Sequence, residues 1–431
     1  MTDAHEWLHA APAHWTRGRL KNLTASATNG AWGSDPVGDG DDVHCIRAAD
    51  FDRTSRRALL AHAPLRHVDA SSLRQHLLRP GDLILEKSGG GEKQPVGMAV
   101  LFTDAVKAVC SNFCARVKPS KNVEPRFLSY VFAAAYEQGL TQAAIKQTTG
   151  IQNLDTEAFF SSPWVYPPEE EQRSIADFLD AETSKLKALD DRFKKLTGLL
   201  EERKAALIAA CFAFNGADGV QVLPLRRAVK RWIDYRGATP EKTESGVTLV
   251  TAKNIRNGHI DLEVSREFIA TDAYADWMRR GLLEVNDVLL TTEAPLGQVA
   301  MVNDTFIALA QRVILLRAKQ DVCSPEWLYW YLLSPQGQAE LELRSTGSTA
   351  LGIKADRLRG VPIPLPTLSE ATQRLGRLAE RVTQIEALRR KLAEQRTLVA
   401  ERRQALITAA VTGQFDVSTA SGRNVAKGVT V

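Results

Sequence analysis

The side chains with the clearest capacity for chemistry are basic ones that stand beside glycines. The run Lys87-Ser88-Gly89-Gly90-Gly91-Glu92-Lys93 is the one glycine-rich loop of the sequence. Because glycine has no Cβ, the backbone amides of such a loop can approach a phosphate closely, and the two lysines supply the opposite charge. The same composition is equally typical of a flexible hairpin tip. The loop therefore suggests anion binding without deciding it.

Further basic residues cluster in two separate parts of the chain, and several have amide side chains nearby. Arginine and lysine contact phosphates, while the amides of Asn257, Gln298 and Gln311 can read base edges through paired hydrogen bonds. A single group of charges is more often a solvated surface than a contact site, but recurrence in both parts favours DNA binding. The candidate DNA-binding residues are Arg47, Arg53, Arg56, Arg57, Lys87, Ser88, Lys93, Lys253, Arg256, Asn257, Arg279, Arg280, Gln298, Arg344 and Lys354.

No catalytic motif accompanies these residues. The sequence has no G-x-x-x-x-G-K-[ST] loop for a nucleoside triphosphate, no G-x-G-x-x-G fingerprint, and no Asn-Pro-Pro-aromatic motif of the kind that amino-methyltransferases use. Its eight histidines include no H-E-x-x-H pair, and its five cysteines include no C-x-x-C pair. We therefore expect free thiols, no catalytic residues and no metal site.

The elements that must position the basic residues belong to an internal repeat. Residues 202–210 (ERKAALIAA) resemble residues 401–409 (ERRQALITA), at an offset of 199. Further landmarks recur in the same order at offsets of 199 to 205, namely 164–167 with 363–366, 125–128 with 325–328, 81–85 with 286–290 and 49–51 with 253–255. Chance explains any one pair, but not five pairs in one order. The chain therefore consists of two similar halves.

Each half ends in a long helix with a heptad stripe. The apolar residues seven apart are Leu179, Leu186, Phe193, Leu200 and Leu207 in the first half, and Leu378, Ile385, Leu392, Val399 and Leu406 in the second. A seven-residue repeat sustained over four heptads predicts a coiled coil. A second seam position is predicted at Leu189 and Leu196, and at Leu388.

Two amphipathic helices lying on their own domains are the alternative. Such helices are usually shorter and follow a 3.6-residue period. Residues 169–204 hold ten acidic and eight basic residues, whereas residues 370–403 hold five acidic and nine basic. This opposite bias favours pairing of the two helices within one chain, in antiparallel orientation, although surface ion pairs contribute little free energy.

The globular parts are predicted to be α+β. Short β-type runs occur at 82–85, 97–102, 287–290 and 312–316, and one helix follows each set, at 125–138 and 325–338. Proline-rich segments at 167–168 and 362–366 are expected to be stiff linkers, because proline restricts φ. Residues 215–219 (NGADG) form a predicted break after the first helix.

The composition is that of an ordinary soluble globular protein. Apolar residues make up 44% and charged residues 25%, and the formal net charge of +4 permits a nucleic-acid partner without requiring one. The first thirty residues contain no apolar block, and the longest small-apolar run is about half of what a membrane helix needs. A cytoplasmic location without a membrane partner is expected.

At this point the architecture resembles that of the specificity (S) subunit of type I restriction-modification systems. The resemblance covers nearly the whole chain. It is carried by the helix opening at 171–183 (EQRSIADFLDAET), the closing segments at 200–208 and 411–416, the turn Tyr235-Arg236-Gly237-Ala238-Thr239-Pro240, and the strand pattern at 287–291 and 295–297. The second helix departs from the family at 369–373, where a Glu-Gln pair is expected.

The resemblance implies a fold of two mixed α/β target-recognition domains separated by two long helices, paired as an antiparallel coiled coil with pseudo-twofold internal repeat. The implied parts are target-recognition domains at 1–165 and 216–365, spacer helices at 166–215 and 366–416, and a flexible tail at 417–431.

The implied function is non-catalytic recognition of a bipartite asymmetric sequence in double-stranded DNA. One half-site is read per domain, and two modification (methyltransferase) subunits and restriction (translocase and nuclease) subunits are recruited. The resemblance places S-adenosylmethionine, ATP and Mg in those partners and no cofactor in this chain. A coiled-coil scaffold without sequence-specific DNA binding is the alternative.

Overall fold

The computed structural model describes residues 10–38, 40–91, 94–148, 150–214, 219–235, 239–347 and 351–417. The chain forms two compact units, Met1–Lys194 with Ala393–Val431, and Lys195–Leu392. We call them unit 1 and unit 2. Glu92 and Lys93 of the glycine-rich loop, most of the predicted break at 215–219, residues 236–238 of the quoted turn and residues 418–431 of the predicted tail lie outside the described residues.

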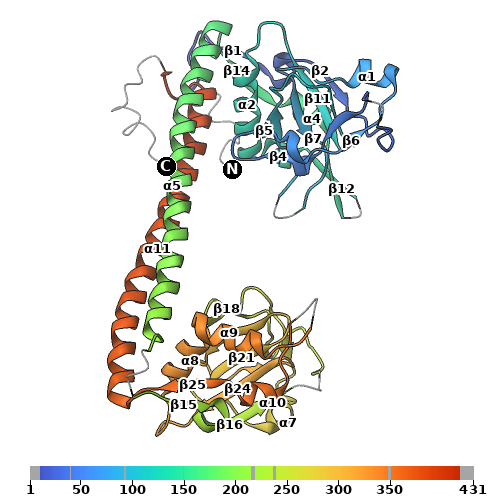
Figure 1. Cartoon of the computed structure of the whole chain (residues 1–431). Coiled ribbons are helices and arrows are strands. Elements are labelled where there is room, and N and C mark those ends of the chain that lie inside the picture. The colour runs from blue at the N-terminus through green and yellow to red at the C-terminus, as the bar shows by residue number, and fades with distance from the viewer. Residues whose placement is uncertain are drawn as a thin grey trace. The chain divides into compact units, whose positions relative to one another are not determined.

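Two long helices run through both units. Helix α5 is Glu169–Cys211, and helix α11 is Leu368–Val411 (Figure 1). Neither contains a proline, and α5 begins with three glutamates, whose charges suit the positive end of the helix dipole. Each helix contributes one segment to unit 1 and the other to unit 2. Among the described residues, no helix is long and apolar enough to cross a membrane.

Ion pairs between the two helices show that they run antiparallel. In unit 1, Arg396 Nε lies 2.6 Å from Asp190 Oδ1. In unit 2, Arg389 pairs with Glu201 at 2.5 Å and Lys204 with Glu386 at 2.7 Å. From one pair to the next, the residue number increases on α5 and decreases on α11. The predicted antiparallel pairing is therefore confirmed.

The predicted heptad stripe is at least partly buried along its whole length. None of its ten residues is exposed, and Leu179, Leu378, Ile385 and Leu406 are buried. The second seam is wrong in part, because Leu196 and Leu388 are 47% and 51% exposed. Two helices alone cover only a narrow strip of each other, so side chains at the margin of that strip stay in contact with water.

Unit 1 is built on a six-stranded sheet with the order β2-β11-β7-β9-β5-β4. Smaller sheets have the orders β10-β3-β6, β12-β13-β8 and β1-β14. The strands are β1 (Thr16–Arg19), β2 (Thr24–Asn29), β3 (Val43–Ile46), β4 (Phe51–Asp52), β5 (Arg57–Ala58), β6 (Leu65–Arg66), β7 (Leu83–Glu86), β8 (Ser88–Gly89), β9 (Ala99–Leu101), β10 (Ala108–Cys110), β11 (Cys114–Pro119), β12 (Ile145–Thr148), β13 (Ile151–Leu154) and β14 (Pro163–Tyr166).

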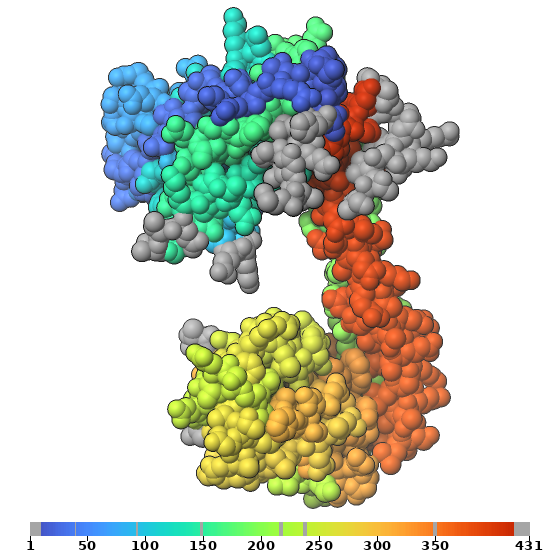
Figure 2. All heavy atoms as spheres, turned by 180° about the vertical axis from the view of Figure 1, so that it is seen from behind, coloured from blue at the N-terminus to red at the C-terminus, as the bar shows by residue number. Residues whose placement is uncertain are grey.

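The helices of unit 1 cover this sheet and join it to the coil. They are α1 (Ala70–His76), α2 (Pro125–Glu137), α3 (Leu140–Ala143) and α4 (Thr156–Ser161), with 3-10 turns at Leu20–Leu23, Ala48–Asp50 and Leu60–His62. Phe127 and Phe132 of α2 share one buried core with Leu179 of α5 and with Leu406 and Ile407 of α11. The red C-terminal part of α11 accordingly lies against this unit (Figure 2).

Unit 2 is built on a four-stranded sheet with the order β16-β24-β21-β22. Smaller sheets have the orders β20-β17-β23, β15-β25 and β18-β19. The elements are β15 (Gln221–Pro224), α6 (Leu225–Ala228), β16 (Val229–Asp234), β17 (Val247–Val250), β18 (Ile255–Arg256), β19 (His259–Ile260), β20 (Phe268–Ile269), α7 (Tyr274–Trp277), a 3-10 turn at Met278–Arg280, β21 (Val288–Thr292), β22 (Leu296–Met301), β23 (Ala308–Leu309), β24 (Val313–Ala318), α8 (Pro325–Leu333), α9 (Pro335–Leu343), α10 (Ala355–Arg359) and β25 (Pro362–Leu365).

The two units repeat one topology, which confirms the internal repeat. The order β2-β11-β7-β9 in unit 1 corresponds to β16-β24-β21-β22 in unit 2. Both units also pair two strands in parallel, β3 with β10 and β17 with β23, next to a third antiparallel strand. The four predicted strands are present as β7, β9, β21 and β24. The α+β prediction is therefore confirmed.

Two local predictions were wrong. The single helix expected at 325–338 is two helices, because proline cannot continue the backbone hydrogen bonding of α8, and the Ser334 hydroxyl caps the new helix by accepting from Gly337 N at 3.0 Å. The stiff linker expected at 362–366 is largely strand β25, which pairs antiparallel with β15. Proline is tolerated there because β25 lies at the edge of a two-stranded sheet.

Candidate nucleic-acid interface

Two of the candidate arginines in unit 1 are held by carboxylates of their own domain. Arg47 donates to both oxygens of Asp50, at 2.9 and 2.8 Å, and Asp50 is 1% exposed. Arg53 lies 3.4 Å from Glu86 Oε2, and Glu86 is also buried. A buried carboxylate without a partner is costly, so both arginines have a structural role that sequence spacing did not reveal.

The next two candidates differ in exposure although they are neighbours. Arg56 is 6% exposed and lies over the ring of Tyr130, with 5.5 Å between the guanidinium carbon and the ring centroid. Its backbone φ of 54° is in the left-handed region, at the end of the β4–β5 turn. Arg57 is exposed and donates to Thr103 Oγ1 at 3.2 Å. Only Arg57 of this pair presents its charge to solvent.

The start of the glycine-rich loop belongs to a sheet. Ser88 and Gly89 form β8, which pairs with β13, and the Ser88 hydroxyl donates to Asn153 Oδ1 at 2.7 Å. A Cβ at Gly90 would lie 2.9 Å from the backbone nitrogen of Val96, so close packing requires glycine there. Lys87 is half-buried. The hairpin interpretation accounts for this part of the loop, and Lys93 is outside the described residues.

Unit 2 holds the candidates that are most available to a ligand. Lys253, Arg256 and Lys354 are exposed, and within the part of the chain that the structure describes none of them forms an ion pair. Lys253 lies in the turn that precedes β18, Arg256 is the last residue of β18, and the exposed Asn257, whose φ is 52°, begins the turn to β19. An exposed cation beside an exposed amide can contact a phosphate and a base edge.

A buried asparagine holds the turn before β18 in place. Asn254 is fully buried, and its Oδ1 accepts from Thr251 N and Thr251 Oγ1, each at 2.9 Å. Its Nδ2 donates to the carbonyls of Asp261 at 2.9 Å and Ser265 at 2.8 Å. All of its hydrogen-bonding groups have partners, so the conformation of the turn is set before any ligand binds.

The remaining candidates of unit 2 have partners of their own. Arg279 pairs with Asp276 at 3.1 Å, and Arg344 pairs with Glu340. Arg280 donates to the Asp234 carbonyl at 2.6 Å and lies over Tyr235. Gln298 is half-buried in β22. Of the candidates in unit 2, Lys253, Arg256 and Asn257 therefore lie near one another in the chain with all three exposed.

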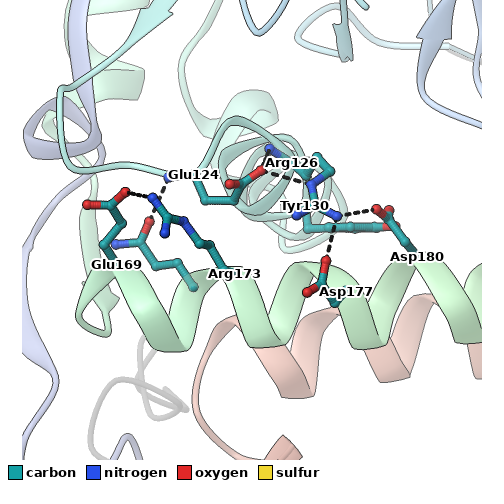
Figure 3. A network of polar contacts seen from close by, with 8 residues as sticks. Glu124, Arg126, Tyr130, Glu169, Arg173, Asp177 and Asp180 are labelled. Carbon is teal, nitrogen blue, oxygen red and sulfur yellow. Dashed lines mark hydrogen bonds and ion pairs between the residues drawn. The ribbon is translucent and has the colours of Figure 1, made fainter.

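Sequence reasoning missed the network that joins α2 to α5 within unit 1 (Figure 3). Arg126, in the first turn of α2, donates to Glu124 at 2.8 Å, Asp177 at 2.7 Å and Asp180 at 3.0 Å. The Tyr130 hydroxyl donates to the other oxygen of Asp180 at 2.7 Å. The spacing of Asp177 and Asp180, about one helical turn apart, was the available signal.

Ionisation favours this network at neutral pH. Burial alone would lower the pKa of Arg126, but hydrogen bonds to Glu124, Asp177 and Asp180 raise it. Burial and the nearby Asp180 raise the pKa of Tyr130 to about 12, so its hydroxyl keeps the proton that it donates. In the described residues, no group of three or more His, Cys, Asp or Glu side chains is placed to hold a metal ion.

Comparison with known proteins identifies the family. The model of the type I restriction modification DNA specificity domain matches residues 80–194 and 237–395, together more than half of the chain. The chain belongs to this family. Each matched segment holds the central strands and helices of one unit, so the family resemblance found in the sequence is confirmed.

Relatives of the specificity family are similar over most of the chain. The specificity subunit of the type I restriction enzyme EcoKI from Escherichia coli strain K12 is 18% identical over 357 residues, covering 78% of this chain and 75% of that protein. A chain from a solved type I restriction-modification system has a TM-score of 0.68 at 20% identity and covers 94% of this chain and 99% of its own. The HsdS subunit from Thermoanaerobacter tengcongensis has a TM-score of 0.51 at 20% identity, covering 94% and 98%.

These findings establish DNA recognition as the function of this specificity-family chain. The two solved structures support the fold alone, because their sequences are distant from this one.

Proposed function

We propose that this chain is the sequence-reading subunit of a type I restriction-modification complex, and that each unit binds one half-site of a bipartite, asymmetric DNA target. The observation that carries the proposal is the repeated topology of the two units with different surfaces on the same framework. Equivalent domains with different exposed residues suit two different half-sites of one target.

The paired helices supply the spacer in this proposal. Both α5 and α11 contribute segments to both units, so the two readers are joined by two continuous helices instead of a flexible linker. Once one unit has bound its half-site, the helices hold the other unit near the second half-site. This raises the effective concentration for the second binding step and so favours binding of the whole target.

In this proposal the partner subunits carry out the catalysis. Two modification subunits would supply S-adenosylmethionine-dependent methylation, and restriction subunits would supply ATP- and Mg-dependent translocation and cleavage. The support is the absence of nucleotide-binding and methyltransferase motifs in the sequence. Purified chain should neither transfer methyl groups to DNA nor hydrolyse ATP. Either activity would contradict the assignment of catalysis to the partners, provided that it co-purifies with the chain in proportion to the amount of chain present.

A domain exchange tests the division of the target. Residues 1–165 are replaced by the corresponding part of a related specificity subunit, and the hybrid is expressed with its modification subunits. The methylated motif is then read by single-molecule sequencing of host DNA. One half-site should change and the other should persist. The reciprocal exchange of residues 216–365 should change only the other half-site. Change of both half-sites, or of neither, would show that the domains do not read separate half-sites.

A binding assay separates this function from that of a scaffold without sequence-specific DNA binding. Gel shifts of the full chain, with duplexes that contain or lack the methylated motif, are run at low and high salt. Non-specific binding should fall steeply with salt while preference for the motif persists. Equal affinity for both duplexes at all salt concentrations would favour the scaffold.

A further inference from the structure

Unit 1 contains two adjoining cavities that share two arginines. The smaller has a volume of about 110 Å³ and the larger about 540 Å³, and Arg56 and Arg403 line both. Arg56 comes from the β4–β5 turn and Arg403 from α11, while α2 and α5 complete the smaller cavity. All of these segments belong to unit 1. Arg56 is one of the sequence-predicted DNA-binding residues, and Arg403 is not.

Neither arginine forms an ion pair with a carboxylate in the described ranges, although Arg56 is only 6% exposed. Arg403 donates to the Thr54 carbonyl, but its buried Nε has no acceptor. Burial and the charge of Arg403 lower the pKa of Arg56 to about 10, and burial also lowers the pKa of Arg403. Burying a cation without a counter-ion costs free energy, so binding of an anion from solution would stabilise unit 1.

The acidic groups nearby are engaged elsewhere or act on the arginines through charge alone, as Glu137 does on Arg56 and Asp52 on Arg403. Asp180 accepts from Arg126 and Tyr130, and Asp52 accepts from Thr54 N at 2.9 Å and Ser55 Oγ at 2.5 Å. Lys187, a third cation of the smaller cavity, pairs with Asp191 at 2.9 Å. Glu137 and Glu401 line the larger cavity without forming an ion pair in the described structure. The positive charge of the smaller cavity is therefore only partly balanced.

The second half of the chain shows what the first half lacks. At the repeat offset of 199, Arg403 corresponds to Lys204, and Lys187 corresponds to Glu386. In unit 2 these two positions form an ion pair of 2.7 Å, so a cation on one helix is neutralised by a carboxylate on the other. In unit 1 both positions are cationic. The carboxylate that unit 2 supplies from its own chain is missing from unit 1.

We propose that the smaller cavity of unit 1 binds a phosphate group between Arg56, Lys187 and Arg403. Ser129 lines the same cavity, and Ser55 and Thr183 line it with hydroxyls that are hydrogen-bonded to Asp52 and Tyr130. Guanidinium and ammonium donors that line one cavity suit the several acceptor oxygens of a tetrahedral phosphate. The phosphate comes either from the DNA backbone or from a free phosphate compound, and both present the same oxygens to the cavity.

Thermal unfolding of the full chain in sodium phosphate, against sodium chloride at equal ionic strength, tests the site. Phosphate at ten times its Kd should raise the Tm of unit 1 by about 3–6 °C. Lys187→Glu, which supplies a carboxylate at the position of Glu386, should abolish this rise, and Arg403→Gln should reduce it. The control is Lys195→Glu, which makes the same charge change at an exposed lysine that lines neither cavity.

Two outcomes would overturn the proposal, and the first does not depend on the variants. If phosphate raises the Tm of the wild-type chain no more than chloride does, the chain has no such site. If phosphate raises the Tm of Lys187→Glu as much as that of the wild-type chain, the phosphate binds elsewhere. Far-ultraviolet circular dichroism confirms that each variant is folded.

A DNA arm distinguishes the two sources. If the phosphate belongs to the DNA backbone, Lys187→Glu should lower the salt slope of DNA binding by about one relative to Lys195→Glu. If it belongs to a free compound, the two variants should bind DNA equally while only Lys195→Glu keeps the rise in Tm. The phosphate titration contains no DNA, so it stands even if the proposed half-site division fails.

Discussion

At the scale of residues, the basic side chains differ in what already neutralises them. Arg47 is committed to the buried Asp50, whereas Lys253 and Arg256 are exposed beside a turn fixed by Asn254. An arginine that balances a buried carboxylate cannot leave it for DNA without a large cost in free energy. Exposed cations beside a fixed turn have no such cost, so they are the better candidates for contact.

The prediction at this scale concerns Arg256. Arg256→Ala should weaken binding of the specific duplex by about 1–3 kcal/mol if the guanidinium reads a base, and should relax one position of one half-site. Fluorescence anisotropy with single-position variants of the target measures both effects. Arg227→Ala is the control, because Arg227 is an exposed arginine of α6 in the same unit. An equal loss in both variants would mean that Arg256 contributes only general charge.

At the scale of elements, the two long helices are held by a narrow apolar stripe with ion pairs at its margin. Glu386 lies between Lys204 and Arg389, at 2.7 and 2.8 Å. Burial alone would raise the pKa of Glu386, but the hydrogen bond and charge of Lys204, with those of Arg389, hold it below its usual range. The ionised carboxylate therefore stabilises the pairing of the helices.

This shift predicts a pH dependence with a definite sign. A lowered pKa means that Glu386 contributes stability above its unfolded pKa of about 4.3, and that this contribution is lost as pH falls through the folded pKa. Glu386→Gln should lower stability by about 0.5–1 kcal/mol at pH 7, since the pair is partly exposed. Urea unfolding of both chains between pH 7 and pH 4 should show the difference shrinking below about pH 4.5. A constant difference would exclude the linkage.

Helix direction predicts a cross-linking pattern. Leu186 and Val399 line one cavity of unit 1. A chain with both residues changed to cysteine should form an intramolecular cross-link with a short bifunctional maleimide, seen as faster migration in a denaturing gel. Leu186 with Ile385 changed instead should not, and cross-linking of that pair would indicate parallel helices.

The native thiols do not interfere with this experiment. All five cysteines are buried, and burial raises the pKa of Cys45 and Cys211 to about 11 and of Cys114 and Cys323 to about 12. Burial also raises the pKa of Cys110. The reactive thiolate is therefore scarce at pH 7. The unmodified chain is the control for residual labelling.

At the scale of the whole molecule, the proposed function makes the length of the paired helices a determinant of the target. The repeat offset allows one heptad to be removed from both helices in register, as residues 190–196 and 389–395. This deletion shortens the pair by about 10 Å, or about three base pairs of DNA.

The shortened chain should lose affinity for the native target, because the two half-sites no longer fit both readers at once. Gel shifts with a series of gap lengths measure the change. A duplex that carries one half-site alone should bind the shortened chain and the natural chain with the same low affinity. This comparison is the control for damage to the domains. Unchanged preference for the native gap would show that the helices do not set the spacing.

Much of the architecture was predictable from the sequence. The offset of 199 residues and the leucine stripes predicted two similar halves and two paired helices, because heptad periodicity and repeated length are properties of the chain itself. The break between α8 and α9 was missed although its signal is local, since Ser334 caps α9 through the nearby Gly337. The strand β25 was missed because its pairing with β15 joins residues that are distant in sequence.

The binding sites depended on tertiary structure. Arg56 and Arg57 are adjacent in sequence, yet one is buried over Tyr130 and the other is exposed, because the positive φ of Arg56 turns the chain at that point. Lys187 and Arg403 are 216 residues apart and line one cavity. Charge and periodicity are local properties that a sequence displays. Which cations meet a carboxylate, and which are left without one, is decided only when distant segments pack together.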